Sequence, residues 1–273
     1  FATDPRFKSL YKDKHREDPS RVAYYGNVTQ MDDALGRILQ TLDSHGLSEN
    51  TLVWFTSDNG PARTRWHNAG STAGLREFKG HLYDGGIRVP GIVRWPGNIK
   101  PGRSSAQPVS GVDVLPTLCQ IAGIAAPSDR KLDGSSIVPV LLGNGAVQRT
   151  KPLFWEFIWA GSRPQVALRD GRWKLLAALD GPKPKPADWT EAPMQLIKTA
   201  RLTGFELYDL DQDPAEKTDL AAAQPEKLAE LRKAMEAIHA DVRAEGPVWP
   251  PFVDPRYEQL RIEWPDYVAK PLE

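Results

Sequence analysis

The short stretch from Thr51 to Gly60 constrains most strongly what this chain can fold into. It is apolar or β-branched through Thr56 and then ends in Asp58, Asn59 and Gly60. A run of this kind is typical of a strand that is covered on both faces by helices, as in a parallel α/β sheet. Because ligands bind outside the carboxyl ends of such strands, Asp58 and Asn59 are expected to stand at a binding site.

The residues at the end of this strand have two interpretations. Asp58 and Asn59 offer a carboxylate and an amide carbonyl, which are hard oxygen donors suited to Ca²⁺ or Mg²⁺. Gly60 lets the backbone turn away from such a site. The same residue types also form ordinary Asx turns at strand ends, without any function. On these residues alone, both interpretations stay open.

The balanced charge of the chain indicates that a ligand is recognised in a local pocket and not by a charged surface. The 273 residues contain 35 basic and 35 acidic side chains, which leaves no electrostatic footprint for nucleic acid or an anionic membrane. No stretch of the sequence approaches the roughly 18 apolar residues of a membrane-spanning helix, so we expect no membrane insertion. The single cysteine, Cys119, lies in an apolar stretch and is interpreted as a small buried hydrophobic residue.

Several elements are expected in the first half. Residues 1–18 are polar and predict irregular chain. Asp18 is a good helix N-cap before Pro19, and apolar residues then recur at three- and four-residue spacing until Gly46. We expect this apolar stripe to pack on a sheet. Asp32 and Asp33 lie within the helix and are interpreted as solvated or structural, because adjacent helical side chains point in different directions.

A strand is expected at residues 91–95, and a short helix from Asp113 to Gly123. Between residues 61 and 74 the pattern predicts a long loop beside the Asp58 site, and long loops are usually functional or disordered. Trp66 and His67 in this loop are candidate substrate contacts, although packing of the loop explains them equally well.

The segment from Lys79 to Pro90 is rich in glycine. Lys79, which precedes a glycine, can reach a bound oxyanion as a compact positive charge, although most lysines are simply exposed. Arg88 is interpreted as a structural ion-pair partner, with Asp84 as the candidate for its carboxylate.

A polar segment at 143–152 predicts a domain boundary, which divides the chain into residues 1–150 and 151–273. Short apolar runs at 153–158, 165–169, 172–176 and 205–210 predict a small antiparallel sheet. A helix opened by Pro225 carries an apolar stripe wide enough to cover one face of that sheet. The tail after Gly246 is expected to pack on the body through its aromatic residues.

One acidic cluster in this part is not interpreted as a calcium site. Asp209, Asp211 and Asp213 resemble the start of an EF-hand loop. The sixth position is Pro214, where the loop requires glycine, and the twelfth is Leu220, where it requires glutamate.

Five motifs together resemble the C-terminal half of the sulfatase family, and their order and spacing match over nearly the whole chain. They are Tyr24–Leu39, Ser57–Gly60, Lys79–Pro90, Asp133–Ser136 and Leu207–Glu216. The run at 69–75 looks most like the branch of arylsulfatase A and N-acetylgalactosamine-6-sulfatase. The resemblance implies an α/β, alkaline-phosphatase-like sandwich with a small α+β C-terminal subdomain of antiparallel strands and one helix. It also implies hydrolysis of sulfate esters by a formylglycine, with one calcium ion.

By this resemblance, Asp58 and Asn59 are metal ligands, and Lys79 is the catalytic residue that holds the sulfate. The family's nucleophile motif, Cys or Ser followed by x-Pro-x-Arg, occurs nowhere in the sequence, and Cys119 does not begin it. The formylglycine and the remaining metal ligands are therefore expected upstream, in a longer chain, and these 273 residues alone are expected to be inactive. Asp84 replaces the family's usual glutamate, and its role is expected to be structural.

Three functions stay open. The favoured one is a sulfuric ester hydrolase acting on sulfated carbohydrates or aryl sulfates. The second is a phosphatase or phosphodiesterase of the alkaline phosphatase superfamily, which would be expected to carry further Asp and His zinc ligands. The third is a non-catalytic protein that binds sulfated glycans. A single cysteine is consistent with a bacterial periplasmic or secreted protein, whereas the substrate and the oligomeric state are left open.

Overall fold

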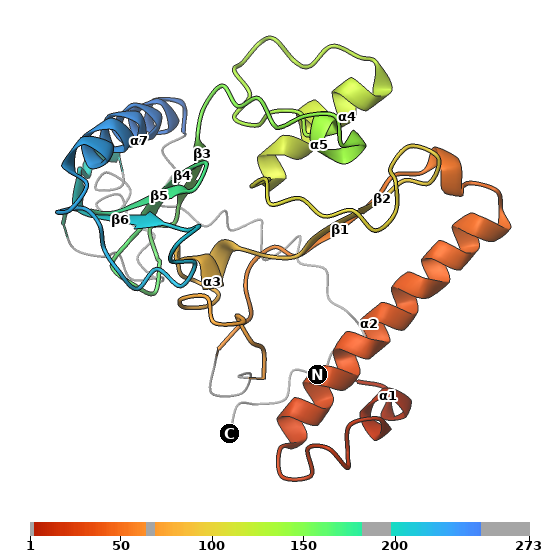
Figure 1. Cartoon of the computed structure of the whole chain (residues 1–273). Coiled ribbons are helices and arrows are strands. Elements are labelled where there is room, and N and C mark those ends of the chain that lie inside the picture. Colours follow the sequence, from red (N-terminus) through yellow and green to blue (C-terminus); the bar gives the residue numbers. More distant parts are fainter. Residues whose placement is uncertain (1–2, 64–68, 182–197, 247–273) are drawn as a thin grey trace, which may run out of the picture.

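The computed structural model describes residues 3–63, 69–181 and 198–246, and two sheets organise them (Figure 1). One sheet pairs β1 (Val53–Thr56) with β2 (Gly91–Arg94). The other has four antiparallel strands in the order β3-β4-β5-β6. These are β3 (Leu153–Glu156), β4 (Val166–Asp170), β5 (Trp173–Leu179) and β6 (Leu202–Asp209). The predicted antiparallel sheet in the second half is therefore confirmed.

The long N-terminal helix forms where its capping residues predict. Helix α2 spans Pro19–Ser44, and the Asp18 carboxylate accepts the Arg21 N–H at 2.9 Å. Gly46 follows with a φ of +66°, a conformation that stops helices readily. The prediction of irregular chain before α2 was wrong in part, because Asp4 caps a short helix, α1 (Pro5–Ser9), which packs on α2.

The expectation that the α2 stripe packs on a sheet was wrong for the described residues. Only Val22 and Gly26 of α2 are buried, while Val28, Met31 and Ile38 are 44%, 49% and 57% exposed. The helix lies apart from the four-stranded sheet (Figure 1), and near its C-terminal end the Asp43 carboxylate pairs with Arg94 of β2 at 3.0 Å. An apolar stripe shows that a helix has a partner, but it does not show which part of a protein supplies that partner.

The strand before Asp58 also differs from its prediction. β1 pairs antiparallel with β2, so that Val53 lies opposite Arg94 and Thr56 opposite Gly91. Its side chains are half-buried or exposed instead of covered on both faces. An apolar run predicts burial of a strand but carries little information about the direction of the neighbouring strand, because that direction is set by chain connections. The strand at 91–95 was correctly predicted.

Short helices connect the remaining segments. They are η1 (Ser48–Asn50), α3 (Asp84–Ile87), η2 (Gly111–Asp113), α4 (Val114–Ala122) and α5 (Val138–Leu142). The predicted helix from Asp113 to Gly123 corresponds to η2 and α4, and Gly123 ends it with a φ of +67°.

Asp113 is fully buried, and its carboxylate accepts two hydrogen bonds of 2.8 Å from Arg149. Cys119 is buried in α4, as predicted. No helix in the described ranges is long and apolar enough to cross a membrane.

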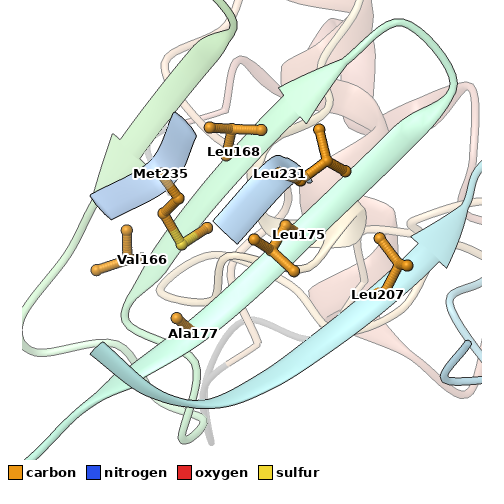
Figure 2. Close-up of a cluster of buried hydrophobic side chains, with 7 residues drawn as sticks. All are labelled: Val166, Leu168, Leu175, Ala177, Leu207, Leu231 and Met235. Atoms are coloured by element: carbon orange, nitrogen blue, oxygen red, sulfur yellow. The ribbon is translucent and has the colours of Figure 1, made fainter. Parts of the chain in front are cut away.

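Helix α7 (Pro225–Glu245) covers one face of the four-stranded sheet, which confirms the predicted stripe. Leu231 and Met235 from α7 pack into a cluster contributed by the strands (Figure 2). Its other members are Val166, Leu168, Leu175, Ala177 and Leu207, all fully buried. Full burial of a large aliphatic side chain contributes roughly 1.5–3 kcal/mol, so this cluster is a core in its own right.

The opposite face of the same sheet packs on the segment that precedes and forms α3. Leu82 and Tyr83 are 3% exposed and contact Ala167, Leu176 and Tyr208 of the strands. The sheet therefore lies between α7 and the α3 segment. β3 begins at Leu153, and the division of the chain at residue 150 stays a prediction. The predicted aromatic tail after Gly246 lies outside the described residues.

We predict that Leu231→Ala lowers the free energy of unfolding by about 2–5 kcal/mol, because it opens a cavity in the core beneath α7. Val242→Ala on the same helix is the control, since Val242 is 39% exposed, and it should cost well under half as much. Urea unfolding followed by circular dichroism measures both. Equal losses would contradict the packing of α7 described above.

Candidate active site

The turn that follows β1 presents the two predicted metal ligands. Asp58 is exposed and Asn59 is half-buried. Ser57 Oγ donates to Asp58 Oδ1 at 3.4 Å and to the Asn59 carbonyl at 3.1 Å. Asn59 Nδ2 donates to the Gly60 carbonyl at 3.0 Å, which orients the amide and leaves its Oδ1 as the predicted ligand atom. These contacts agree with either interpretation, an ordinary turn at a strand end or a metal site.

Gly60 ties this turn to α3. Its N–H donates to the Gly86 carbonyl at 2.9 Å. A Cβ on Gly60 would lie only 1.9 Å from the Gly85 carbonyl oxygen, a distance at which backbone must move. Glycine is therefore required at position 60 because the Gly85 carbonyl approaches its Cα closely, whatever turn the backbone makes there.

The two glycines of α3 pack in the same way on the segment that carries Lys79. Gly85 N–H donates to the Arg76 carbonyl at 2.8 Å, and a Cβ on Gly85 would lie 2.1 Å from the Glu77 oxygen. A Cβ on Gly86 would lie 2.1 Å from the His81 oxygen. The two glycines of the Asp-Gly-Gly sequence are thus explained by backbone-to-backbone packing.

Lys79 lies next to the Asp58 turn. Its N–H donates to the Pro61 carbonyl at 3.1 Å, and Pro61 is three residues beyond Asp58. The Lys79 side chain is exposed, and no carboxylate of the described residues forms an ion pair with it. Gly80 follows with a φ of +90°, which turns the backbone behind the lysine. The backbone thus brings the Lys79 ammonium and the two predicted metal ligands, Asp58 and Asn59, to neighbouring turns.

The other two predicted substrate contacts, Trp66 and His67, lie outside the described residues.

Asp84, the first residue of α3, is held by a buried ion cluster. It is 2% exposed, and its Oδ1 lies 2.7 Å from Lys174 Nζ on β5. The same ammonium lies 2.8 Å from Glu216 Oε1, and Glu216 Oε2 accepts the Asp84 N–H at 2.6 Å. Burial raises the pKa of the Glu216 carboxyl above its ordinary value, while Lys174 and the Asp84 N–H oppose that rise.

The expected pairing of Arg88 with Asp84 is confirmed at 3.7 Å, and Arg169 lies at the same distance from Asp84 Oδ2. The structural role expected for Asp84 agrees with this environment. Sequence reasoning missed Lys174 and Glu216. The available signal was a lysine inside the apolar run Trp173–Leu179, since a charge in a buried strand requires a buried partner.

A second network joins the same two regions. Arg76 donates to the Tyr208 hydroxyl at 3.0 Å and to the Glu216 carbonyl at 2.8 Å, and its guanidinium lies 3.8 Å from the Tyr83 ring centroid. Both tyrosines donate to Glu206 Oε2, at 2.7 and 2.8 Å. Burial, together with Glu206, raises the pKa of both hydroxyls, so they remain protonated donors.

The turn between β3 and β4 supplies a third contact to the lysine segment. Gly161 N–H donates to the Gly80 carbonyl at 2.6 Å. A Cβ on Gly161 would lie 2.6 Å from His81 Nε2, so the imidazole rests directly on this glycine. The residues on both sides of Lys79 are therefore held by the C-terminal sheet and its loops.

Asp58 and Asn59 carry the kind of ligand atoms that a hard cation prefers, but two ligands are too few to hold it. A carboxylate and an amide oxygen suit calcium, which takes about six to eight oxygens. The described residues contain no cluster of three or more His, Cys, Asp or Glu side chains that could hold a metal ion. Asp209 binds Arg172, and Asp213 accepts the N–H groups of Lys217 and Thr218. These two carboxylates therefore hold Arg172 and the turn that follows β6.

Two family models match the chain. The model described as Sulfatase matches residues 3–124, and the model described as N-sulphoglucosamine sulphohydrolase, C-terminal, matches residues 77–183. The chain is 35% identical to steryl-sulfatase from Mus musculus over 236 residues, and 35% identical to arylsulfatase A from Homo sapiens over 224 residues. These matches cover 81% and 80% of this chain but 37% and 43% of the relatives. The chain therefore spans less than half the length of these relatives.

Solved structures show the same relationship. A sulfatase structure from work on glycosaminoglycan metabolism by Bacteroides thetaiotaomicron is 26% identical, with a TM-score of 0.65, and the match covers 86% of this chain and 46% of that chain. A phosphonate monoester hydrolase of Agrobacterium radiobacter is 28% identical, with a TM-score of 0.54, over 80% of this chain and 41% of that chain. The fold is that of the alkaline-phosphatase-like α/β hydrolases. Within that class, the Sulfatase model matches residues 3–124, and the relatives named above are sulfatases.

We predict that Gly86→Ala destabilises the protein by about 1–3 kcal/mol, because the new methyl group cannot fit against the His81 carbonyl without backbone movement. Gly91→Ala is the matched control, since nothing lies within 4 Å of a Cβ at that position. Thermal unfolding of both variants gives the comparison. If Gly86→Ala unfolds at the same temperature as the wild type, α3 does not pack as described.

Proposed function

We propose that the full-length protein is a sulfuric ester hydrolase that acts on sulfated carbohydrates or aryl sulfates. The observation that carries the proposal is the placement of Lys79 on a turn whose backbone is bonded to the Asp58-Asn59-Gly60-Pro61 segment. The match to the Sulfatase family model and the named activities of the relatives support it.

In this proposal, Lys79 binds the sulfate group. Its ammonium is exposed, lies next to the Asp58 turn and has no carboxylate partner among the described residues. Negative charge accumulates on the oxygens of a sulfate ester as it reacts, and a fixed positive charge stabilises that state more than the ground state. Lys79 thus contributes both to substrate binding and to catalysis.

Asp58 and Asn59 would hold the calcium ion, with the remaining oxygen ligands supplied from outside the described residues. When bound, calcium would supply a divalent charge that neutralises sulfate oxygens. The nucleophile would be the formylglycine expected in an N-terminal half. The proposal that this chain is the C-terminal part of a longer enzyme is supported by the exposed apolar stripe of α2 and by the length of the relatives. The 273 residues alone would therefore be inactive.

Two alternatives have distinct metal and kinetic signatures. A phosphatase or phosphodiesterase of the same class would bind two zinc ions, whereas the proposed sulfatase binds one calcium ion. A non-catalytic glycan-binding protein would bind a sulfated sugar without turnover. We propose a periplasmic or secreted location in a bacterium, supported by likeness to a bacterial sulfatase structure and by the single cysteine.

For Lys79→Ala in the full-length enzyme, we expect kcat for an aryl sulfate to fall about a hundredfold or more, because one donor to the developing oxyanion is lost. Lys100→Ala is the control, since Lys100 is also exposed but lies beyond β2, and its kcat should equal that of the wild type. An unchanged kcat for Lys79→Ala would mean that this lysine is an ordinary surface charge.

Asp58→Ala should weaken calcium binding and abolish turnover, because it removes a charged oxygen ligand from a hard cation. Isothermal titration calorimetry with calcium chloride, together with elemental analysis of the purified protein, measures the first effect. Asp32→Ala removes an exposed carboxylate from α2 and should leave calcium affinity unchanged. Wild-type affinity and stoichiometry in Asp58→Ala would refute the metal assignment.

A further inference from the structure

We propose that Lys174, on β5 of the C-terminal sheet, is a positioning residue for the Lys79 turn. It acts through Asp84 and α3, and it touches neither substrate nor metal. The catalytic part of this inference rests on the proposed sulfatase function. The structural part, that Lys174 holds the segment 76–88 in place, stands independently of it.

The first link is the contact that Lys174 and Glu216 make with Asp84. Lys174 Nζ, fully buried, lies 2.7 Å from Asp84 Oδ1 and 2.8 Å from Glu216 Oε1. Glu216 then accepts the Asp84 N–H at 2.6 Å. The first residue of α3 is thus held by both its side chain and its backbone, and both contacts come from the C-terminal subdomain.

The second link runs from α3 to the site. Gly85 N–H bonds to the Arg76 carbonyl at 2.8 Å, and Gly86 carbonyl accepts the Gly60 N–H at 2.9 Å. The first of these bonds fixes the segment that leads into Lys79, and the second fixes the turn after Asp58. Since glycines allow both approaches without an intervening side chain, a displacement of α3 moves both turns.

The chemistry of the cluster favours positioning over net stabilisation. A buried ion pair recovers little more than its desolvation cost, whereas removing one partner leaves an uncompensated charge. A hydrophobic contact tolerates sliding, but two carboxylates that converge on one ammonium allow a single arrangement. Lys174 therefore determines where α3 sits on the sheet.

Lys174→Met in the full-length protein tests the structural part by hydrogen–deuterium exchange, which does not depend on activity. We expect amides in residues 76–88 to exchange at least about tenfold faster, because their opening becomes easier. The control is Arg149→Met, which breaks another largely buried pair, with Asp113 at 2.8 Å. It should speed exchange around residues 110–136 and leave residues 76–88 unchanged. Wild-type exchange of 76–88 in Lys174→Met would overturn the proposal.

A double-mutant cycle with Lys79→Ala tests the catalytic part on an aryl sulfate. Lys174→Met should lower kcat about 10- to 100-fold when Lys79 is present, since small displacements of catalytic groups have effects of this size. In the Lys79→Ala background the same change should cost less than about threefold, because the group being positioned is gone. Equal losses in both backgrounds would mean that Lys174 does not act through Lys79.

A milder variant covers the case in which Lys174→Met fails to fold. Glu216→Gln keeps the size of the side chain, but only one of its two terminal atoms is an acceptor, whereas Lys174 and the Asp84 N–H face different oxygens of Glu216. It should show the same pattern in exchange and in the cycle, with smaller changes, and wild-type behaviour in both would overturn the proposal. A wild type that hydrolyses no sulfate ester would refute the proposed function, while the exchange result would still decide the structural part.

Discussion

The close approach of three backbone segments at α3 is the constraint on which the site depends. Gly60, Gly85 and Gly86 each lie where an added Cβ would come within about 2 Å of a carbonyl oxygen. This packing brings the Asp58 turn, the Lys79 turn and α3 together without intervening side chains, and the hydrogen bonds of Gly60 and Gly85 fix their register. Asp58 and Lys79 are exposed and Asn59 is half-buried, whereas the three supporting glycines are buried.

The buried charges explain how this assembly is attached to the rest of the molecule. Asp84, Lys174 and Glu216 are each at most 2% exposed, and the Lys174 ammonium pairs with both carboxylates at the boundary between α3 and the four-stranded sheet. The Arg76 network adds a second polar connection beside it. Two apolar clusters on opposite faces of the sheet supply the driving force, and the polar groups determine the arrangement. The four-stranded sheet is thus a structural support for the site.

Local signals in the sequence predicted the elements well. Asp18 with Pro19, Gly123, and the stripe through Leu231 and Met235 each correspond to a cap or a covered face in the structure. The neighbours of β1 and α2 were not predicted correctly, because an apolar pattern encodes burial without naming the partner. Asp58, Asn59 and Lys79 were candidates by residue type and position, and the family resemblance gave them their roles, whereas Lys174 was missed. Its partner Asp84 is 90 residues away, and lysine is ordinarily an exposed residue.

The central claim is that Asp58, Asn59 and Lys79 form one site for calcium and a sulfate group. A crystal structure of the full-length protein, grown with calcium and a sulfate-bearing sugar, tests it most directly. The account predicts calcium within about 2.3–2.6 Å of an Asp58 carboxylate oxygen and of Asn59 Oδ1. It also predicts the Lys79 ammonium within hydrogen-bond distance, about 2.7–3.2 Å, of a sulfate oxygen. Calcium bound elsewhere, or a sulfate that Lys79 does not contact, would contradict the account.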